Sequence, residues 1–247
     1  MRAEERLLAD GFARQSTGHY IQDPVFAGYL REAVRIGYRP IAYEQLPTQR
    51  PGGGGIAARE AAQTANLLAA LTAYPGAKML IHVGHGHLAE VAMPRDDGRE
   101  EWMGAQLKRA TGVDPLTIDQ TFLTDLSPQA RAAYPVAAAK VGTRPGVFFA
   151  GGAPLVLGWP AGAVDLQVVH PARAYRWGRP IWLQALGGRP VAVPARLLPR
   201  SGERLVQAFA ADAPADAVPL DQVLVTAGTP APMMLLPRVK VRFATQP

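Results

Sequence analysis

The sequence contains no cysteine in 247 residues, and this absence excludes several classes of site. A disulfide scaffold, a thiolate zinc site, an iron–sulfur cluster and a cysteine nucleophile all need a sulfur atom that the chain lacks. Any metal or acid–base chemistry must therefore depend on the carboxylates and the five histidines. The compartment stays open, because a chain without cysteine suits the periplasm as well as the cytoplasm.

Long apolar runs are also missing. No stretch approaches the roughly 18 consecutive apolar residues of a transmembrane helix, and the charged opening MRAEERLLADGFAR has no signal-peptide core. We therefore expect a soluble chain without a transmembrane segment. The common signatures of serine hydrolases, zinc proteases and P-loop proteins are absent too. The glycine run at 52–55 is accordingly more typical of a flexible lid or a linker than of a phosphate site.

Lysine is scarce among the 26 basic residues. Only positions 78, 108, 140 and 240 are lysines, and the other 22 basic residues are arginines spread along the whole chain. A nucleic-acid-binding protein more often has a basic stripe interleaved with aromatic residues. The closest approach to such a stripe is the short segment 173–179, RAYRWGR. Despite a formal net charge of +6, we predict no nucleic-acid partner.

The first part of the chain alternates between helical and strand patterns. Residues 1–144 are therefore predicted to form an α/β domain with an open, mainly parallel sheet and flanking helices. Asp23-Pro24 is a strong helix start, because aspartate caps a helix and proline suits its first position. The expected helices span residues 24–36, 57–73 and 101–111, and the expected strands span residues 38–44, 78–84 and 115–122.

The second part of the chain has a different pattern of residues. After a boundary near Arg144-Pro145-Gly146, short apolar runs are separated by glycine and proline, with few helical periods between them. Residues 145–247 are therefore predicted to form a smaller, β-rich domain. The length of the chain allows this division into two domains.

The most informative segment is KMLIHVGHGHLAE, at 78–90. Three of the five histidines, His82, His85 and His87, fall within six residues where the expected strand ends. Ligands of an open parallel sheet bind at this edge. His85 and His87 are one residue apart, so in an extended backbone both rings would project to the same side and could share a metal ion or a proton.

The residues around these histidines favour a site as well. Gly84 and Gly86 would let the chain turn sharply and let a substrate approach the backbone. A helix starting near Leu88 would aim its free N–H groups at the same place. The alternative is that one or more histidines caps the sheet and bonds to a neighbouring loop, and His82 is expected to be a core residue.

Carboxylates and an arginine are candidates for the same site. Glu44 ends the preceding expected strand, where it would serve general acid–base work or metal binding beside the imidazoles, or simply face water. Arg59 and Glu60 begin the helix after the glycine loop, and Arg59 could reach an anionic or carbonyl oxygen with its bidentate fork. Weaker candidates are Asp119, which ends another expected strand, together with His19 and His170.

These motifs resemble a known superfamily. An Arg-Glu pair opening a long helix (Arg59 onwards), a lysine-led apolar strand and the sequence Gly-His-Gly-His-Leu at 84–88 resemble the erythromycin esterase-like, Tiki/TraB and haem-binding ChaN-like proteins. The resemblance covers roughly residues 20–120. It matches His87 to the family's GxGHL histidine, Arg59 to its helix arginine and Glu44 to its strand-end glutamate.

Two features depart from that superfamily. Its first strand and its early Glu and His have no counterpart here, so the chain would lack the N-terminal part of the domain, and a missing part could have carried a periplasmic or secretory signal. The β-rich region after residue 145 does not map onto the family and would be an addition.

The resemblance implies a hydrolase of an ester, amide or peptide bond. His87 would act as general base, helped by Glu44 and oriented by Arg59, on a small-molecule or peptide substrate. His85 and His87 would be the ligands of any divalent metal, zinc, manganese or iron, because neutral imidazoles bind these ions well. The alternatives are a haem- or metal-binding protein on the same scaffold without catalysis, and a truncated interaction protein without activity.

Overall fold

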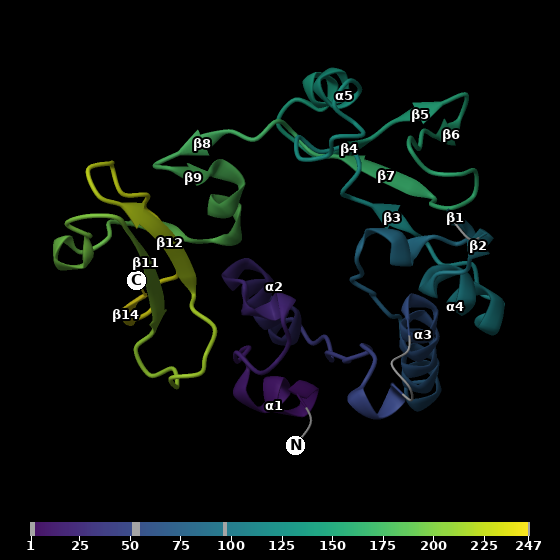
Figure 1. Cartoon of the computed structure of the whole chain (residues 1–247), viewed down its shortest axis with the longest axis horizontal. Helices are drawn as coiled ribbons and strands as arrows, with labels where there is room; N and C mark the ends of the chain where they lie inside the picture. Colours follow the sequence, from purple (N-terminus) through teal and green to yellow (C-terminus); the bar gives the residue numbers. More distant parts are fainter. Residues whose placement is uncertain (1–2, 51–54, 96–97, 247) are drawn as a thin grey trace. The chain divides into compact units, whose positions relative to one another are not determined.

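A computed structural model describes residues 3–50, 55–95 and 98–246, so most of the glycine run at 52–55 lies outside the described residues. The chain divides into two compact units (Figure 1). The first unit combines the segments Met1–Ala42 and Arg173–Pro247, and the second unit is the segment Tyr43–Ala172. The boundary expected near residue 145 falls inside the second unit.

The helices of the first unit follow the local sequence signals. Helix α2 begins at Pro24, and Asp23 caps it by accepting hydrogen bonds at Oδ1 from the N–H groups of Val25 and Phe26, at 2.8 and 3.2 Å. This confirms the helix expected from Asp23-Pro24, since the cap satisfies N–H groups that the first turn leaves unpaired. The helical elements are α1 (Ala3–Asp10), η1 (Tyr20–Gln22), α2 (Pro24–Arg35), η4 (Ile181–Leu186) and η5 (Ala195–Leu197).

The strands of the first unit form small antiparallel sheets. Strand β11 lies between β12 and β14, β10 pairs with β13, and β8 pairs with β9. Alternate side chains of these strands meet in an apolar core that includes Val206, Val225 and Met234. The strands are β8 (Tyr175–Arg176), β9 (Arg179–Pro180), β10 (Arg189–Val191), β11 (Glu203–Ala210), β12 (Asp221–Thr226), β13 (Met234–Leu236) and β14 (Val241–Gln246).

The second unit is organised by helices α3 and α4. Both form where the sequence predicts them, and Gly112 ends α4 in the left-handed conformation, with φ of 68°. Leu67 of α3 packs with Met103 and Leu107 of α4 in one core cluster. The helical elements of this unit are η2 (Pro47–Gln49), α3 (Ile56–Ala73), η3 (His85–Leu88), α4 (Met103–Thr111) and α5 (Tyr134–Val141).

The expected open parallel sheet is wrong. In the part of the chain that the structure describes, every sheet has two or three strands, and the single parallel pairing of the second unit joins β3 to β7 in the sheet β3-β7-β4. The strands of this unit are β1 (Met93–Arg95), β2 (Gly98–Glu100), β3 (Ile118–Asp119), β4 (Gly146–Val147), β5 (Phe149–Ala150), β6 (Ala153–Pro154) and β7 (Leu166–Val169).

The segments expected as strands at 38–44 and 78–84 show why this prediction fails. Neither is paired with a strand among the described residues. Met79, Ile81 and Val83 pack against the α3 and α4 cluster, whereas Leu80 between them is 65% exposed. The apolar run thus buries one face against helices. An apolar pattern requires burial, but it does not specify a hydrogen-bonded neighbour, because strand pairing depends on residues far away in the sequence.

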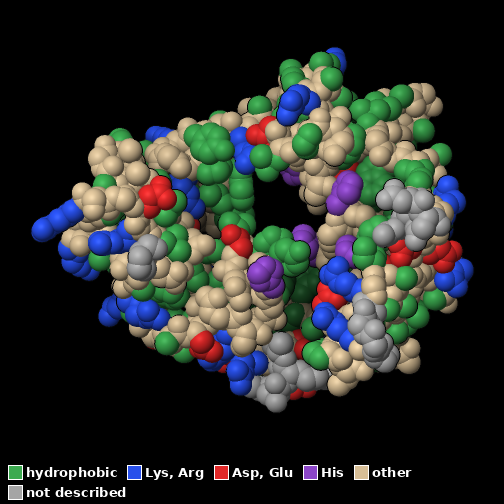
Figure 2. All heavy atoms as spheres, viewed as in Figure 1, with side chains coloured by type: hydrophobic (Ala, Val, Ile, Leu, Met, Phe, Trp, Pro, Cys, Tyr) green, Lys and Arg blue, Asp and Glu red, His purple; other side chains and the backbone are tan. Residues whose placement is uncertain are grey.

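Two further observations concern the apolar length of the helices and the distribution of the basic side chains. None of the helices in the described ranges is long and apolar enough to cross a membrane. Figure 2 shows Lys and Arg side chains scattered over the visible face without gathering into one stripe. Arg179 belongs to the short basic and aromatic segment 173–179. It makes a bidentate ion pair with Asp221 at 2.8 and 2.9 Å, so its charge is neutralised within the first unit.

Candidate functional site

The histidine segment forms a tight turn. His85–Leu88 is the 3-10 helix η3, and Ala89 after it returns to an extended conformation. The expectation of an extended backbone with both rings on one side is therefore wrong, and the helix expected near Leu88 does not form. A 3-10 helix places successive residues about 120° apart, so residues two positions apart point in different directions.

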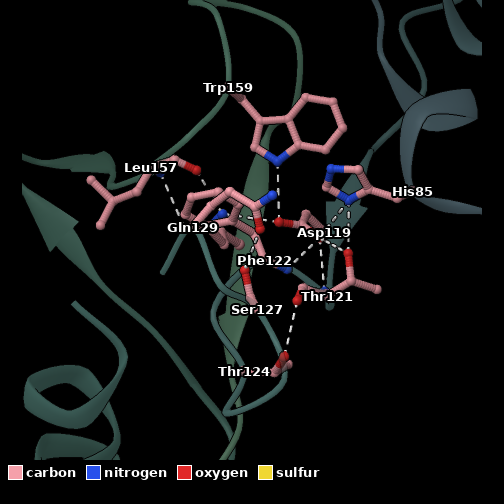
Figure 3. A network of polar contacts seen from close by, with 10 residues as sticks. His85, Asp119, Thr121, Phe122, Thr124, Ser127, Gln129, Leu157 and Trp159 are labelled. Atoms are coloured by element: carbon pink, nitrogen blue, oxygen red, sulfur yellow. Dashed lines mark hydrogen bonds and ion pairs between the residues drawn. The ribbon is translucent and has the colours of Figure 1, made fainter. Parts of the chain in front are cut away.

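His85 takes part in a hydrogen-bonded chain that ends on a buried carboxylate (Figure 3). Its Nδ1 atom lies 2.8 Å from the hydroxyl of Thr121, and that hydroxyl lies 2.9 Å from Oδ1 of Asp119. Asp119 ends β3, as the sequence predicts for a strand-end carboxylate, and its side chain is 0% exposed. The indole of Trp159 packs against the imidazole, with 4.6 Å between the ring centroids.

This chain of contacts assigns the tautomer of His85. A hydroxyl has one hydrogen, and the ionised carboxylate of Asp119 can only accept, so Thr121 donates to Asp119. The hydroxyl therefore accepts from His85, which must carry its proton on Nδ1. In the neutral ring the lone pair is then on Nε2. The His85 side chain is 53% exposed, and Nε2 makes no hydrogen bond with a residue that the structure describes.

Asp119 is held ionised by its donors. Its burial alone would raise the pKa, but the hydrogen bonds from Thr121, Gln167 and Trp159 outweigh burial and lower the pKa below its ordinary value. Gln167 and Trp159 donate to Oδ2 at 2.9 and 3.1 Å. The carboxylate is therefore a fixed negative charge beneath the Thr121 hydroxyl.

His87 contacts a different carboxylate. Its Nδ1 atom lies 2.7 Å from Oε1 of Glu60, whose side chain is 0% exposed. The pair is within ion-pair distance but lacks hydrogen-bond geometry, and both atoms are buried without another hydrogen-bond partner. The imidazole itself is 16% exposed and packs edge-to-face on Trp102. As in His85, it is Nδ1 that lies on the side of the carboxylate, so Nε2 is the other ring nitrogen.

Glu60 links three elements of the second unit. Its Oε2 atom accepts a hydrogen bond of 2.8 Å from the N–H of Met103, the first residue of α4. A carboxylate at this position satisfies a helix N-terminus and interacts well with its partial positive charge. Glu60 of α3 therefore holds the start of α4 with one oxygen and faces His87 of η3 with the other.

The glycines of the turn provide room, and they do not adopt unusual backbone angles. A Cβ atom on Gly86 would lie 3.3 Å from the ring of Trp102, and one on Gly84 would lie 3.2 Å from Cδ2 and 3.7 Å from Nε2 of His87. Gly104 of α4 is tighter still, since its Cβ would lie 2.6 Å from the carbonyl oxygen of Leu88. Small residues thus let η3 pack directly against the first turn of α4.

Glu44 and Arg59 contact one another. Arg59 donates to both oxygens of Glu44, at 2.9 and 2.5 Å, and Gln63 donates to Oε2 at 3.1 Å. These hydrogen bonds, that of Arg59 first, lower the pKa of Glu44 to about 2. No contact within the described residues joins Glu44 to His87. Glu44 is therefore an ionised partner of α3, and Glu60 is the carboxylate beside His87.

The expected metal ligands do not converge. His85 and His87 face separate carboxylates, and the structure, over the residues it describes, contains no group of three His, Asp or Glu side chains arranged to hold a metal ion. The divalent metal expected from the sequence therefore gains no support from the geometry. Haem needs only one axial imidazole, and the partly exposed side chain of His85 is the candidate for that ligand.

The other histidines take no part in these two pairs. His82 is exposed rather than in the core, because the alternation of the segment turns it away from α3, and its carbonyl oxygen accepts a hydrogen bond of 2.6 Å from Tyr43. Burial lowers the pKa of His170, which directly follows β7. His19 belongs to the first unit.

Sequence reasoning missed the groups that complete each pair. The sequence patterns do not single out Thr121, Trp159 or Gln167, and they mark Glu60 only as part of a helix start. One signal was present: an aspartate at a strand end followed two residues later by threonine is typical of a turn in which the aspartate accepts local N–H groups. Thr121 indeed donates its backbone N–H to Asp119 at 2.8 Å.

No protein family, curated protein or solved structure matches this chain.

Proposed function

We propose that the second unit hydrolyses an ester, amide or peptide bond by general acid–base catalysis, with His85 and His87 as the catalytic residues. The observation that supports this most directly is the chain from His85 through Thr121 to Asp119. It fixes one tautomer, leaves an exposed Nε2 lone pair, and ends on a carboxylate that can stabilise the ring when it becomes protonated. A catalytic base is typically oriented by a neighbouring group in this way, as His85 is by Thr121 and Asp119.

His85 is the general base in this proposal. Its Nε2 removes a proton from a water molecule while the oxygen of that water bonds to the carbonyl carbon of the substrate. The resulting imidazolium then returns the proton to the leaving oxygen or nitrogen as the bond to the carbonyl carbon breaks. Asp119 is a positioning residue that acts through Thr121, since it touches neither water nor substrate.

His87 is the second acid–base group, and Glu60 positions it. Its Nε2 edge borders Gly84, where there is no side chain to block an approaching group. The Nδ1 contact with Glu60 is short but poorly aligned, and contacts of this kind often align only when substrate is bound. The two histidines contact separate carboxylates, so each imidazole is positioned independently of the other.

Glu44 and Arg59 have a supporting role here. A carboxylate with a pKa near 2 stays ionised and is a poor base near neutral pH. The pair with Arg59 instead fixes the segment before η2 against the first turns of α3, where Glu60 also lies. The resemblance to the erythromycin esterase-like superfamily motivates the substrate class, and the two histidine pairs supply the mechanism.

The test is a hydrolysis screen of chromogenic esters, anilides and peptides with the full chain, without and with a chelator. His85→Asn and His87→Asn should each lower kcat by about 10²-fold or more, the usual size of a general acid–base contribution. His82→Gln is the matched control, because His82 is an exposed histidine three residues away, and it should retain activity. Full activity in both His85→Asn and His87→Asn would refute the proposal.

The competing function is haem or metal binding without turnover. It is favoured by one observation: an imidazole that presents Nε2 and anchors Nδ1 through a hydroxyl to a carboxylate is also typical of a metal or haem ligand. Titration with haem, followed by the Soret band, distinguishes the two functions. Tight binding lost in His85→Ala, together with no turnover of any substrate, would support binding in place of hydrolysis.

A further inference from the structure

The first unit has its own hollow, away from the histidine turn in sequence and built by other residues. It has a volume of about 500 Å³ and opens to solvent. The segment around η1 and the start of α2 forms most of its wall, and η4 supplies Trp182. All of these residues belong to the first unit, so the hollow does not depend on the second unit.

Aromatic rings dominate this hollow. Tyr20 and Trp182 are 76% and 50% exposed, and Phe26 lines the wall beside them. The ring of His19 packs edge-to-face on Tyr20, with 5.5 Å between the centroids. Exposed tyrosine and tryptophan rings are costly to leave in water, and their faces carry partial negative charge. A hollow lined by such rings favours a ligand that is both apolar and positively charged.

The charge of the wall agrees with this preference. Asp23 is the one charged residue among those that line the hollow. Its Oδ1 atom caps α2 by accepting from Val25 and Phe26, so the first N–H groups of that helix are already taken. Oδ2 accepts no hydrogen bond from a residue that the structure describes. The carboxylate therefore adds a negative charge to the aromatic wall.

We propose that this hollow, formed by Tyr20, Phe26, Trp182 and the carboxylate of Asp23, binds a small organic cation of the alkylated ammonium class. The alkyl groups contact the rings, and the delocalised positive charge is attracted by the ring faces and by Asp23. Cation–π contacts at exposed sites contribute about two- to five-fold each to affinity. The hollow uses none of the residues of the proposed hydrolytic centre, so either proposal can fail without the other.

The experiment is a calorimetric titration of the full chain with choline and with 3,3-dimethylbutan-1-ol, its neutral isostere. We expect choline to bind at least ten-fold more tightly than the neutral compound. Asp23→Asn should weaken choline binding by about five-fold without loss of the helix, because asparagine caps helices as well as aspartate does. Trp182→Leu keeps an apolar side chain but removes the ring, so it should weaken choline binding by about two- to five-fold. Tyr20→Leu offers a second ring variant if Trp182→Leu does not fold.

Two variants serve as matched controls. Glu32→Gln removes a carboxylate from α2, the helix that Asp23 caps. Leu186→Ala removes an exposed apolar side chain from η4, the 3-10 helix that contains Trp182. Neither Glu32 nor Leu186 lines the hollow. Both should leave choline binding unchanged. The proposal is overturned if choline shows no binding, if the neutral isostere binds equally well, or if the affinity for choline is unchanged in Asp23→Asn and in the ring variants.

Discussion

The hydroxyl of Thr121 lies 2.8 Å from Nδ1 of His85 and donates its own hydrogen to the buried Asp119. This arrangement decides which nitrogen of the imidazole carries the proton, although His85 and Asp119 are themselves 3.9 Å apart. Asp119 thus acts on the exposed ring through one intervening hydroxyl. The relationship can be tested without a substrate, because it predicts a tautomer.

Replacing Thr121 should change that tautomer. In Thr121→Val the hydroxyl that accepts from Nδ1 is lost, so the fixed preference for the Nδ1–H form should disappear and the Nε2–H form should become populated. Long-range ¹H–¹⁵N NMR spectra of the imidazoles measure this directly. Thr121→Ser keeps the hydroxyl and should retain the Nδ1–H form. An unchanged His85 tautomer in Thr121→Val would show that the hydroxyl does not orient the ring.

Asp119→Asn should destabilise the second unit. The new amide would bring N–H groups toward Thr121, Gln167 or Trp159, which are themselves donors, and would leave buried polar groups unpaired. Each such group costs about 1–3 kcal/mol, so we expect a loss of about 3 kcal/mol in the free energy of unfolding, measured in urea. Asp114→Asn is the control: its side chain is 72% exposed, so the loss should be much smaller than in Asp119→Asn. Equal losses would contradict the buried role of Asp119.

The pair of Glu44 and Arg59 predicts a measurable titration. The pKa of Glu44 is lowered to about 2, from an ordinary 4.5, chiefly by the hydrogen bonds from Arg59. ¹³C NMR of the carboxyl group should show this value, and Arg59→Met should move it upward toward the ordinary value. Arg109→Met, which removes a charge that pairs with Glu101, should leave it unchanged.

The sign of the stability effect follows from the lowered pKa. The contribution of ionised Glu44 to the free energy of unfolding is fully present above the unfolded pKa of 4.5. It decreases as the pH falls and is lost at about pH 2, because the carboxyl group of the unfolded chain takes up its proton first. The side chain of Glu44 is 52% exposed, so solvent screening keeps this contribution below about 1 kcal/mol. A stability difference between wild type and Glu44→Gln that grows as the pH falls toward 2 would contradict this sign.

Gly104→Ala should disturb the histidine turn. A Cβ atom there would lie 2.6 Å from the carbonyl oxygen of Leu88 and 2.8 Å from that of Ala89, and backbone atoms cannot move aside cheaply. Overpacking of this kind costs about 1–3 kcal/mol, and the NMR signals of His85 and His87 should shift with it.

Gly28→Ala is the comparison for this substitution. Gly28 lies inside α2 with no heavy atom within 4 Å of the added Cβ, so alanine should stabilise the chain by about 0.5–1 kcal/mol. Urea unfolding followed by circular dichroism measures both variants. A neutral or stabilising Gly104→Ala would mean that η3 and α4 are not in close contact.

Part of the site could be predicted from the sequence. The histidine segment, Glu44, Arg59 and Asp119 were all recognisable as chemistry-bearing residues near the ends of apolar segments. Their partners were not recognisable, because strand ends that lie near one another do not determine which side chain bonds to which. Glu60 shows this well: its neighbour Arg59 pairs with Glu44, while Glu60 itself turns inward to His87 and the start of α4.

By itself, the sequence determined the features that depend on neighbours along the chain. The Asp23 cap, the alanine-rich helix α3 and the glycine end of α4 are set by the capping and the helix propensity of a few adjacent residues. The tertiary structure decided everything that depends on distant partners. It left the segment at 78–84 packed on helices instead of in a parallel sheet and folded His85–Leu88 into a tight turn. It also placed His85 and His87 beside separate carboxylates. The reason is that burial can be satisfied by many different neighbours, whereas hydrogen bonds and ion pairs need one particular partner at one particular distance.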